Sequence, residues 1–268
     1  MRSISSRQNP IVRTFRELAA EPSADGTRLL LDGAHLVQEA RAAGLAIEIA
    51  AVAASHAANG SETARLADAL ARDNVRVVTV TEPVMKAISP VRTPSGVVAI
   101  VSRRPTAVAQ ICRHPDALIV AAVDVQDPGN LGALLRAAEA GGATGAVVCG
   151  KSASPYSWKA VRGSMGSVLR LPVAAGVAPE ALLSRARTFN VRSLATVPRD
   201  GLAPDRVDWR GRLLLFVGGE GPGLSRDMID ACDARVSIPM QPPVESLNVA
   251  VAAALLVYEA RRQRVLAS

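Results

Sequence analysis

The sequence predicts an α/β protein made of two units, each with a sheet covered by helices. Short apolar runs alternate along the whole chain with segments of helical periodicity. In the second half this alternation repeats often enough to indicate a mainly parallel sheet with helices on both faces. A basic, proline-containing stretch interrupts the pattern after residue 102 and predicts a linker. We therefore expect one domain at 1–105, a linker at 106–116 and a second domain at 117–268.

The first unit is expected to begin with an amphipathic helix. Asn9-Pro10 precedes an apolar stripe of Ile11, Val12, Phe15 and Leu18, which is typical of a capped helix start. Four apolar runs predict strands, at Leu29–Leu31, Ile47–Val52, Val75–Val80 and Val97–Val101. Helices are expected between them, from the Asp32-Gly33 turn to Gly44, at Glu62–Arg72 and at Pro83–Ile88.

The second unit is expected to hold five strands and five helices. The strands are predicted at Leu118–Val123, Gly145–Cys149, Arg192–Val197, Leu213–Val217 and Arg235–Ile238. The helices are predicted at Leu131–Ala140, near Trp158–Val168 and Pro179–Phe189, briefly after Leu224, and from Ser246 onward.

The charge balance points to a polyanionic partner. The net charge is +7, and phosphates neutralised by basic residues release counterions. An arginine-rich proteome without a specific partner is the alternative explanation. Aromatic residues are only 3% of the chain, so wide stacking platforms for single-stranded RNA are not expected.

Cysteine and histidine usage argues against disulfides and metals. The three cysteines and three histidines are isolated, so we expect free thiols in a reducing compartment and no metal site. The first residues lack an apolar core, and no long uncharged apolar run follows. A cytoplasmic protein without membrane contact is therefore expected.

The first chemically informative segment is DPGNLGALLRAAEAGGA, residues 127–143. It follows a buried strand, and Asn130 is expected to be the N-cap of a helix that Gly141-Gly142 ends. Arg136 lies off the apolar stripe of this helix, near the carboxyl end of a strand, where open α/β sheets bind ligands. A surface ion pair with Glu139 is the alternative role for this arginine.

The second segment is LLLFVGGEGPGL, residues 213–224. Four glycines after a buried strand indicate a sharp turn or a backbone that comes close to another group. The segment is neither a P-loop nor a dinucleotide fingerprint, since no Lys-Ser/Thr follows and the glycine spacing differs. Glu220 stands among the glycines, where a carboxylate has no packing role.

The third segment is VSIPMQPPVESLNVAVAAALLVYEA, residues 236–260. A strand passes through prolines into a helix that Ser246 is expected to cap, with Asn248 in its first turn. The helix is apolar nearly all round, so it should be buried, against a second subunit if not within one chain. For Asn248 the alternative to a site role is plain helix capping.

In this order and spacing, the three segments resemble the motifs of the SpoU/TrmH family of RNA 2′-O-ribose methyltransferases, within the SPOUT superfamily. The basic stretch WKAVRGSMGSVLRLP, residues 158–172, resembles the region between the first two motifs. Residues 1–103, including LLLDGAHLVQEARAAG, resemble the small RNA-binding domain of the family, which is related to ribosomal proteins that bind kink-turn RNA.

The resemblance implies a fold, a cofactor and an assembly. The second domain would contain a deep trefoil knot, a rare exception among folds. Its loops would bind S-adenosyl-L-methionine through Gly218, Ile238 and Leu247, and the protein would act as a homodimer. The implied reaction is transfer of the methyl group to a ribose 2′-hydroxyl of structured RNA, ribosomal RNA in preference to transfer RNA.

The resemblance also implies the catalytic residues, which are Asn130, Arg136, Glu220, Ser246 and Asn248. Arg136 resembles the residue that is proposed to assist deprotonation in this family, but arginine is a poor base because its pKa exceeds about 12. We therefore expect Arg136 to hold the target phosphate and to stabilise developing negative charge on oxygen. The third motif departs from the family pattern, because QPPVESLN carries two prolines where many relatives have a glycine.

Three other functions are compatible with parts of this sequence. A transfer RNA 2′-O-methyltransferase would share every motif. A non-catalytic RNA-binding or ribosome-assembly protein would share the fold but bind no cofactor. A methyltransferase acting on a small molecule or a base nitrogen would not need the ribose-type motifs or the basic first unit.

Overall fold

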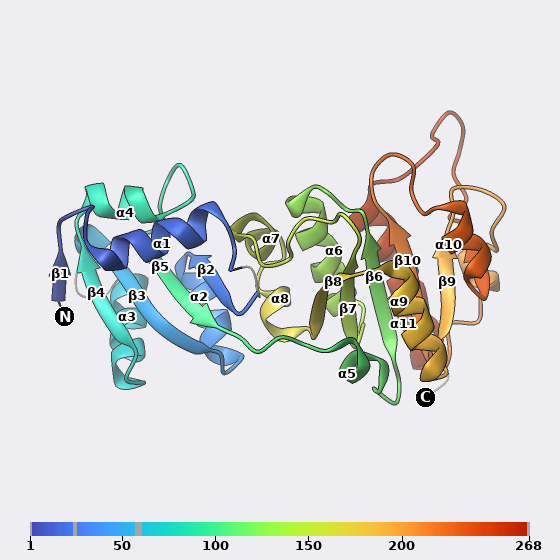
Figure 1. The fold of residues 1–268 in the computed structure, drawn as a ribbon, viewed down its shortest axis with the longest axis horizontal. Helices are drawn as coiled ribbons and strands as arrows, with labels where there is room; N and C mark the ends of the chain where they lie inside the picture. The colour runs from blue at the N-terminus through green and yellow to red at the C-terminus, as the bar shows by residue number, and fades with distance from the viewer. Residues whose placement is uncertain (1, 24–25, 57–60, 267–268) are drawn as a thin grey trace. The chain divides into compact units, whose positions relative to one another are not determined.

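The computed structural model describes residues 2–23, 26–56 and 61–266, which form two compact units. The first unit consists of Met1–Pro105 together with Tyr156–Leu169, and the second of Thr106–Pro155 together with Arg170–Ser268. Both units are of the α/β type (Figure 1). The sequence places residues 156–169 in the second domain, whereas their contacts group them with the first unit.

The first unit contains a mixed five-stranded sheet in the order β1-β4-β3-β5-β2. Its strands are β1 (Arg2–Ile4), β2 (Arg28–Asp32), β3 (Ala46–Ala53), β4 (Arg76–Val80) and β5 (Val97–Ser102). β5 runs antiparallel to both β2 and β3. The helices are α1 (Pro10–Ala20), α2 (Ala34–Ala42), α3 (Glu62–Arg72), α4 (Glu82–Ile88) and the 3₁₀ turn η1 (Ala54–His56). Asn9 caps α1 by accepting a hydrogen bond from the Ile11 amide, as predicted.

The second unit contains a six-stranded sheet in the order β11-β9-β10-β6-β7-β8, in which every pair is parallel. This confirms the predicted parallel sheet. The strands are β6 (Leu118–Val123), β7 (Gly145–Cys149), β8 (Val173–Val177), β9 (Arg192–Thr196), β10 (Leu213–Gly218) and β11 (Ala234–Val236). The helices are α5 (Val108–Cys112), α6 (Pro128–Ala140), α9 (Pro179–Thr188), α10 (Arg226–Ala231), α11 (Val249–Leu266) and the 3₁₀ turn η2 (Pro204–Arg206).

Four elements differ from the prediction, each for a local reason. The strands β1 and β8 were not expected, since β1 has three residues and β8 is rich in alanine and glycine. The stretch expected as a linker contains α5, whose Ile111 and Cys112 are buried in the core of the second unit. The helix expected near Trp158–Val168 is divided into α7 (Trp158–Gly163) and α8 (Ser167–Arg170). Met165 and Gly166 both have positive φ, which ends the first of them.

The helix α6 is held on the sheet by its apolar stripe and by the last helix. Leu131, Leu134, Leu135 and Ala138 are all fully buried, as the helical spacing predicts. A Cβ atom at Gly141 would overlap the side chain of Val257, so α11 approaches the end of α6 closely. Both termini of α6 are therefore fixed by neighbours, one by α11 and the other by the N-cap described below.

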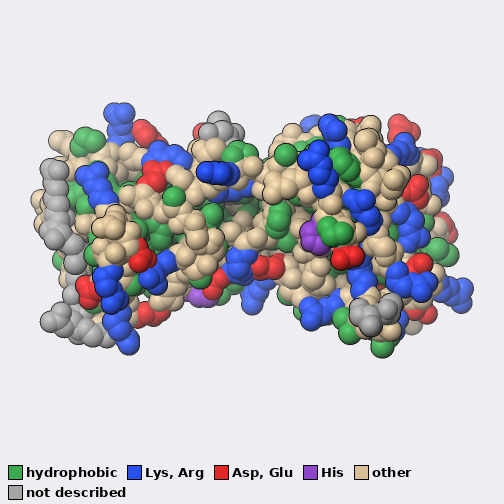
Figure 2. All heavy atoms as spheres, turned by 90° about the horizontal axis from the view of Figure 1, so that it is seen from below, with side chains coloured by type: hydrophobic (Ala, Val, Ile, Leu, Met, Phe, Trp, Pro, Cys, Tyr) green, Lys and Arg blue, Asp and Glu red, His purple; other side chains and the backbone are tan. Residues whose placement is uncertain are grey.

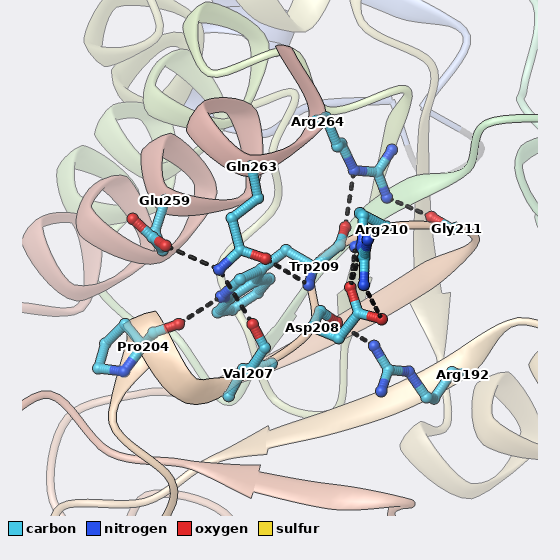
Figure 3. A network of polar contacts seen from close by, with 10 residues as sticks. All are labelled: Arg192, Pro204, Val207, Asp208, Trp209, Arg210, Gly211, Glu259, Gln263 and Arg264. Atoms are coloured by element: carbon cyan, nitrogen blue, oxygen red, sulfur yellow. Dashed lines mark hydrogen bonds and ion pairs between the residues drawn. The ribbon is translucent and has the colours of Figure 1, made fainter. Parts of the chain in front are cut away.

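Hydrogen bonds around Trp209 attach the C-terminal part of α11 to the segment that precedes β10 (Figure 3). The fully buried indole donates from Nε1 to the Pro204 carbonyl at 2.8 Å. Gln263 accepts from the Trp209 amide at 3.1 Å and donates to the Val207 carbonyl at 3.0 Å. Arg264 donates to the Trp209 carbonyl at 3.0 Å, and burial lowers the pKa of its guanidinium. This network fixes the distal end of the helix whose first residues reach the candidate site.

Replacement of Trp209 by phenylalanine should lower the free energy of unfolding by about 1–3 kcal/mol, because the Pro204 carbonyl loses its donor. Urea denaturation measures the change. Trp158→Phe is the matched control, since the half-buried Trp158 indole donates no hydrogen bond within the described residues. Equal losses in the two variants would contradict the role assigned to the Trp209 hydrogen bond.

The cysteines of the second unit are free thiols, and two of them are buried. Burial raises the pKa of Cys149 to about 12 and that of Cys232 to about 11. Since the thiolate is the reactive form, Cys149 in the folded protein should resist iodoacetamide at pH 8 and react once unfolded. Mass spectrometry of the labelled peptides tests this, and equal labelling in both states would contradict it.

Lys and Arg are interspersed with Asp and Glu over the face drawn in Figure 2. In the part of the chain that the structure describes, no helix is both long enough and apolar enough to cross a membrane.

Candidate functional site

A cavity of about 360 Å³ lies where β9, β10 and β11 of the second unit end. Ligand pockets in proteins range from roughly 300 to 1,000 Å³. Its walls come from the carboxyl ends of the strands, the loop after β10, the segment after β11 and the start of α11. Three residues expected to bind the cofactor, Gly218, Ile238 and Leu247, line this cavity, as do Glu220 and Ser246.

The loop after β10 needs its glycines because it lies against other backbone. Gly218 pairs in register with Val123, so β10 and β6 end side by side. The Gly219 amide donates to the Val123 carbonyl at 2.7 Å, and a Cβ atom at Gly219 would overlap the Asp124 carbonyl oxygen. A Cβ at Gly218 would lie 2.6 Å from the Leu224 nitrogen. The backbone therefore closely approaches other backbone here, and the glycines of this loop line the cavity without side chains.

Three of the predicted polar residues form one hydrogen-bonded chain. Asn130 donates from Nδ2 to Glu220 Oε1 at 2.5 Å, and its Oδ1 accepts from Asn248 Nδ2 at 2.9 Å. These residues come from α6, from the loop after β10 and from the start of α11. They are 90 and 118 positions apart along the chain, and folding brings them together beside the cavity.

Both helix caps at the site differ from the prediction. Asp127, and not Asn130, caps α6, since its carboxylate accepts from the Asn130 amide at 2.7 Å and Pro128 occupies the first helical position. Asn248, and not Ser246, caps α11, since its Oδ1 accepts from the Ala250 amide at 2.9 Å. Because Asp127 caps α6, the Asn130 side chain can bond Glu220, and Asn248 both caps α11 and binds Asn130.

Arg136 takes no part in the hydrogen bonds that link Glu220, Asn130 and Asn248. It is exposed on α6, six residues after Asn130, which places the two side chains about 120° apart around the helix. The alternative pairing with Glu139 does not occur, because Glu139 accepts two hydrogen bonds from Arg170 at 2.8 and 2.7 Å. Within the residues described, no hydrogen bond or ion pair engages the Arg136 guanidinium, so it is available to an anion from outside the chain.

Several wall residues carry no chemical signal in the sequence. Thr196, Val197 and Pro198 line the cavity from the end of β9, and Met240 lines it from the segment after β11. The signal that would have found the first three is their position at the carboxyl end of a predicted parallel strand, where open sheets bind ligands. Asp127 was recognisable from Pro128, because proline is favoured at the first position of a helix.

A family model described as the SpoU rRNA Methylase family matches residues 117–258, and one described as an MRM3-like substrate binding domain matches residues 9–99. The chain is 34% identical to a protein of Synechocystis sp. described as an uncharacterized tRNA/rRNA methyltransferase, over 99% of this chain and 96% of that protein. It is 29% identical to the 23S rRNA (guanosine(2553)-2′-O)-methyltransferase RlmP of Bacillus subtilis, over 97% of this chain and 100% of that protein.

Solved structures agree with these matches. The fold is similar to that of an S-adenosylmethionine-bound rRNA methyltransferase from Sinorhizobium meliloti, with a TM-score of 0.85, 28% identity and 97% of each chain covered. The first family model spans more than half of this chain, and it includes most of the unit that contains the cavity and the hydrogen-bonded residues. The protein therefore belongs to the SpoU rRNA methylase family.

Proposed function

We propose that this protein is an RNA methyltransferase that transfers the methyl group of S-adenosyl-L-methionine to a ribose 2′-hydroxyl. The observation that carries the proposal is the chain of Glu220, Asn130 and Asn248 beside a cavity walled by bare glycine backbone. Family membership supplies the reaction class, and the related rRNA methyltransferase from Sinorhizobium meliloti binds this cofactor.

The cavity suits the cofactor in both shape and chemistry. Apolar side chains, including Ile238, Met240 and Leu247, can cover an adenosine group, and Gly218 lets it lie against backbone. When bound, S-adenosyl-L-methionine supplies an electrophilic methyl group on a positively charged sulfur. The three residues proposed to bind it are Gly218, Ile238 and Leu247.

The polar residues are proposed to act on the ribose. The unengaged Arg136 would bind the target phosphate and stabilise negative charge developing on the hydroxyl oxygen. Asn130 and Ser246 would orient the ribose, and Asn248 would hold Asn130. The hydroxyl oxygen must approach the methyl group in line with the carbon–sulfur bond, so much of the catalysis consists of positioning the ribose.

The substrate is proposed to be ribosomal RNA. Residues 9–99 match a substrate-binding domain, and the related RlmP acts on 23S rRNA. The net charge of +7 favours a polyanion. We propose that the first unit binds a bent RNA element, as kink-turn-binding ribosomal proteins do, and that the enzyme acts in the cytoplasm, where ribosomal RNA is found.

Calorimetry and labelling test this function. S-adenosyl-L-methionine should bind the purified protein, which a purely RNA-binding protein would not show. With cofactor labelled in its methyl group and total RNA as substrate, the label should enter ribosomal RNA. Label confined to transfer RNA would overturn the choice of substrate, and the absence of both binding and transfer would overturn the function itself.

We also propose that the protein is a homodimer that pairs through α11. Val251, Leu255 and Tyr258 are 47%, 50% and 51% exposed, and their spacing puts them on one face of the helix. Three exposed apolar side chains in a row, on a helix whose opposite face is buried, are typical of a subunit interface.

Leu255→Asp should convert the dimer to a monomer, because a carboxylate would be buried without a partner at the centre of the stripe. Light scattering after gel filtration measures the mass. Leu202→Asp is the control, since Leu202 is 48% exposed and lies outside α11. A mass unchanged by Leu255→Asp would contradict pairing through this face.

The trefoil knot implied by the family resemblance is a further proposal for the second unit. Its support is the path of the chain after β11, which lies at one edge of the sheet. The following segment and the loop after β10 line one cavity, and α11 then packs on α6 near the middle of the unit. An experimentally traced chain in which the last helix does not pass through a loop would contradict it.

A further inference from the structure

The start of α11 determines which side-chain amide atoms of Asn248 and Asn130 are oxygen and which are nitrogen. The Asn248 Oδ1 atom accepts from the backbone amides of Ala250 and Val251, at 2.9 and 3.4 Å. Only the oxygen of an amide can accept, so the Asn248 nitrogen must face Asn130. The helix cap therefore decides which way the Asn248 amide points.

The orientation of Asn248 in turn fixes the orientation of Asn130 toward Glu220. Because Asn248 donates to Asn130, the atom of Asn130 that faces it must be oxygen. The other atom of the Asn130 amide is then the nitrogen, which donates to Glu220 Oε1. Glu220 therefore serves as the hydrogen-bond acceptor at the end of this series, and Asn130 holds one of its two carboxylate oxygens in place.

The second carboxylate oxygen of Glu220 is not engaged. Within residues 2–23, 26–56 and 61–266, no hydrogen bond reaches Glu220 Oε2 and no Lys, Arg or His forms an ion pair with this side chain. Glu220 is also part of the cavity wall. Among the candidate catalytic residues, only Glu220 combines an ionisable acceptor with a place on that wall.

On the basis of the proposed function, we propose that Glu220 accepts the proton of the ribose 2′-hydroxyl. A lone pair of the hydroxyl oxygen forms the new bond to the methyl carbon, and the carbon–sulfur bond breaks with its electron pair returning to sulfur. The proton moves from the hydroxyl oxygen to Glu220 Oε2. The products are the methyl ether, neutral S-adenosylhomocysteine and a protonated carboxyl group, which then loses its proton to water.

A carboxylate is a sufficient base for this step. As the oxygen–carbon bond forms, the hydroxyl proton becomes more acidic. A carboxylate can take this proton while the bond forms, so the oxygen carries partial negative charge and not the positive charge of a protonated ether, whereas an arginine, with a pKa above about 12, is already protonated and cannot receive the proton. Asn130 and Asn248 are positioning residues in this scheme, and Arg136 stabilises charge.

Glu220→Gln is the decisive variant, because the amide oxygen of glutamine can still accept from Asn130. The affinity for S-adenosyl-L-methionine, measured by calorimetry, should stay within threefold of wild type. The single-turnover rate constant for methyl transfer to RNA should fall by roughly 10²–10⁴-fold. Between pH 7 and 9 the wild-type rate constant should be flat, whereas that of the variant should rise about tenfold per pH unit, as hydroxide replaces the missing acceptor.

Two positioning and charge variants complete the test. Asn248→Asp keeps the cap acceptor but cannot donate to Asn130, so its rate constant should fall while its pH profile stays flat. Arg136→Ala should also give a lower rate constant with a flat profile. A Glu220→Gln enzyme with a rate constant within threefold of wild type, or with a reduced but pH-independent one, would overturn the proposal. A pH-dependent profile in Arg136→Ala would overturn it too, and a wild-type enzyme that makes no 2′-O-methyl product would instead overturn the proposed function.

Discussion

Replacement of Arg136 by alanine is expected to lower the rate of methyl transfer by roughly 10²–10³-fold, the usual cost of removing one group that stabilises a developing oxyanion. The guanidinium is exposed and engages no acidic or carbonyl group among the described residues, so its removal should leave the fold intact. Because Arg136 does not line the cavity, the affinity for S-adenosyl-L-methionine should not change. Labelled methyl transfer and calorimetry measure the two quantities.

Arg185→Ala is the matched control for this prediction. Arg185 is an exposed arginine of the same unit, on α9, and it does not line the cavity. The Arg185→Ala substitution removes one positive charge from the second unit, as Arg136→Ala does. It should leave the rate of methyl transfer within about twofold of wild type, as surface substitutions usually do. Near-normal turnover in Arg136→Ala, with cofactor binding intact, would show that the arginine has no part in the chemistry.

Gly219→Ala is expected to weaken binding of S-adenosyl-L-methionine by roughly 10- to 100-fold. The added Cβ atom would overlap the carbonyl oxygen of Asp124, so the loop that carries Glu220 must move away from β6. Overpacking of this kind costs about 1–3 kcal/mol, and the displaced loop forms one wall of the cavity. Calorimetric titration with the cofactor measures the effect.

Gly176→Ala is the control that introduces backbone strain without a steric overlap. Gly176 in β8 has a φ of +71°, and a Cβ atom there meets nothing within 4 Å. The control should therefore lose some stability but bind the cofactor normally. If Gly219→Ala bound the cofactor as tightly as wild type, the loop after β10 would not be part of the binding site.

The sequence predicted the regular elements of the second unit well because their signals are strong and local. The strand Leu118–Val123 is a continuous apolar run, as a strand covered on both faces must be, and its bounds were predicted correctly. The strand β8 was missed because alanine and glycine give no such signal. The division between α7 and α8 depends on the positive φ of Met165, which no propensity indicates.

The two misplaced caps show where local reasoning stops. Asp127 and Asn130 are both good capping residues, as are Ser246 and Asn248, so residue type alone cannot choose within either pair. Pro128 favours Asp127 in the first case. In the second case the choice depends on Asn130, 118 positions away, whose carbonyl oxygen holds the Asn248 amide. Contacts of this kind exist only in the folded chain.

The position of the methyl group in the product tests most directly whether the enzyme transfers it to a ribose oxygen. RNA methylated by the purified enzyme with labelled S-adenosyl-L-methionine should be treated with alkali and the fragments separated. Alkali cleaves RNA through the 2′-hydroxyl, so the label should be recovered in alkali-resistant dinucleotides that yield a 2′-O-methylnucleoside on full digestion. Label recovered in mononucleotides that carry a methylated base would contradict the claim.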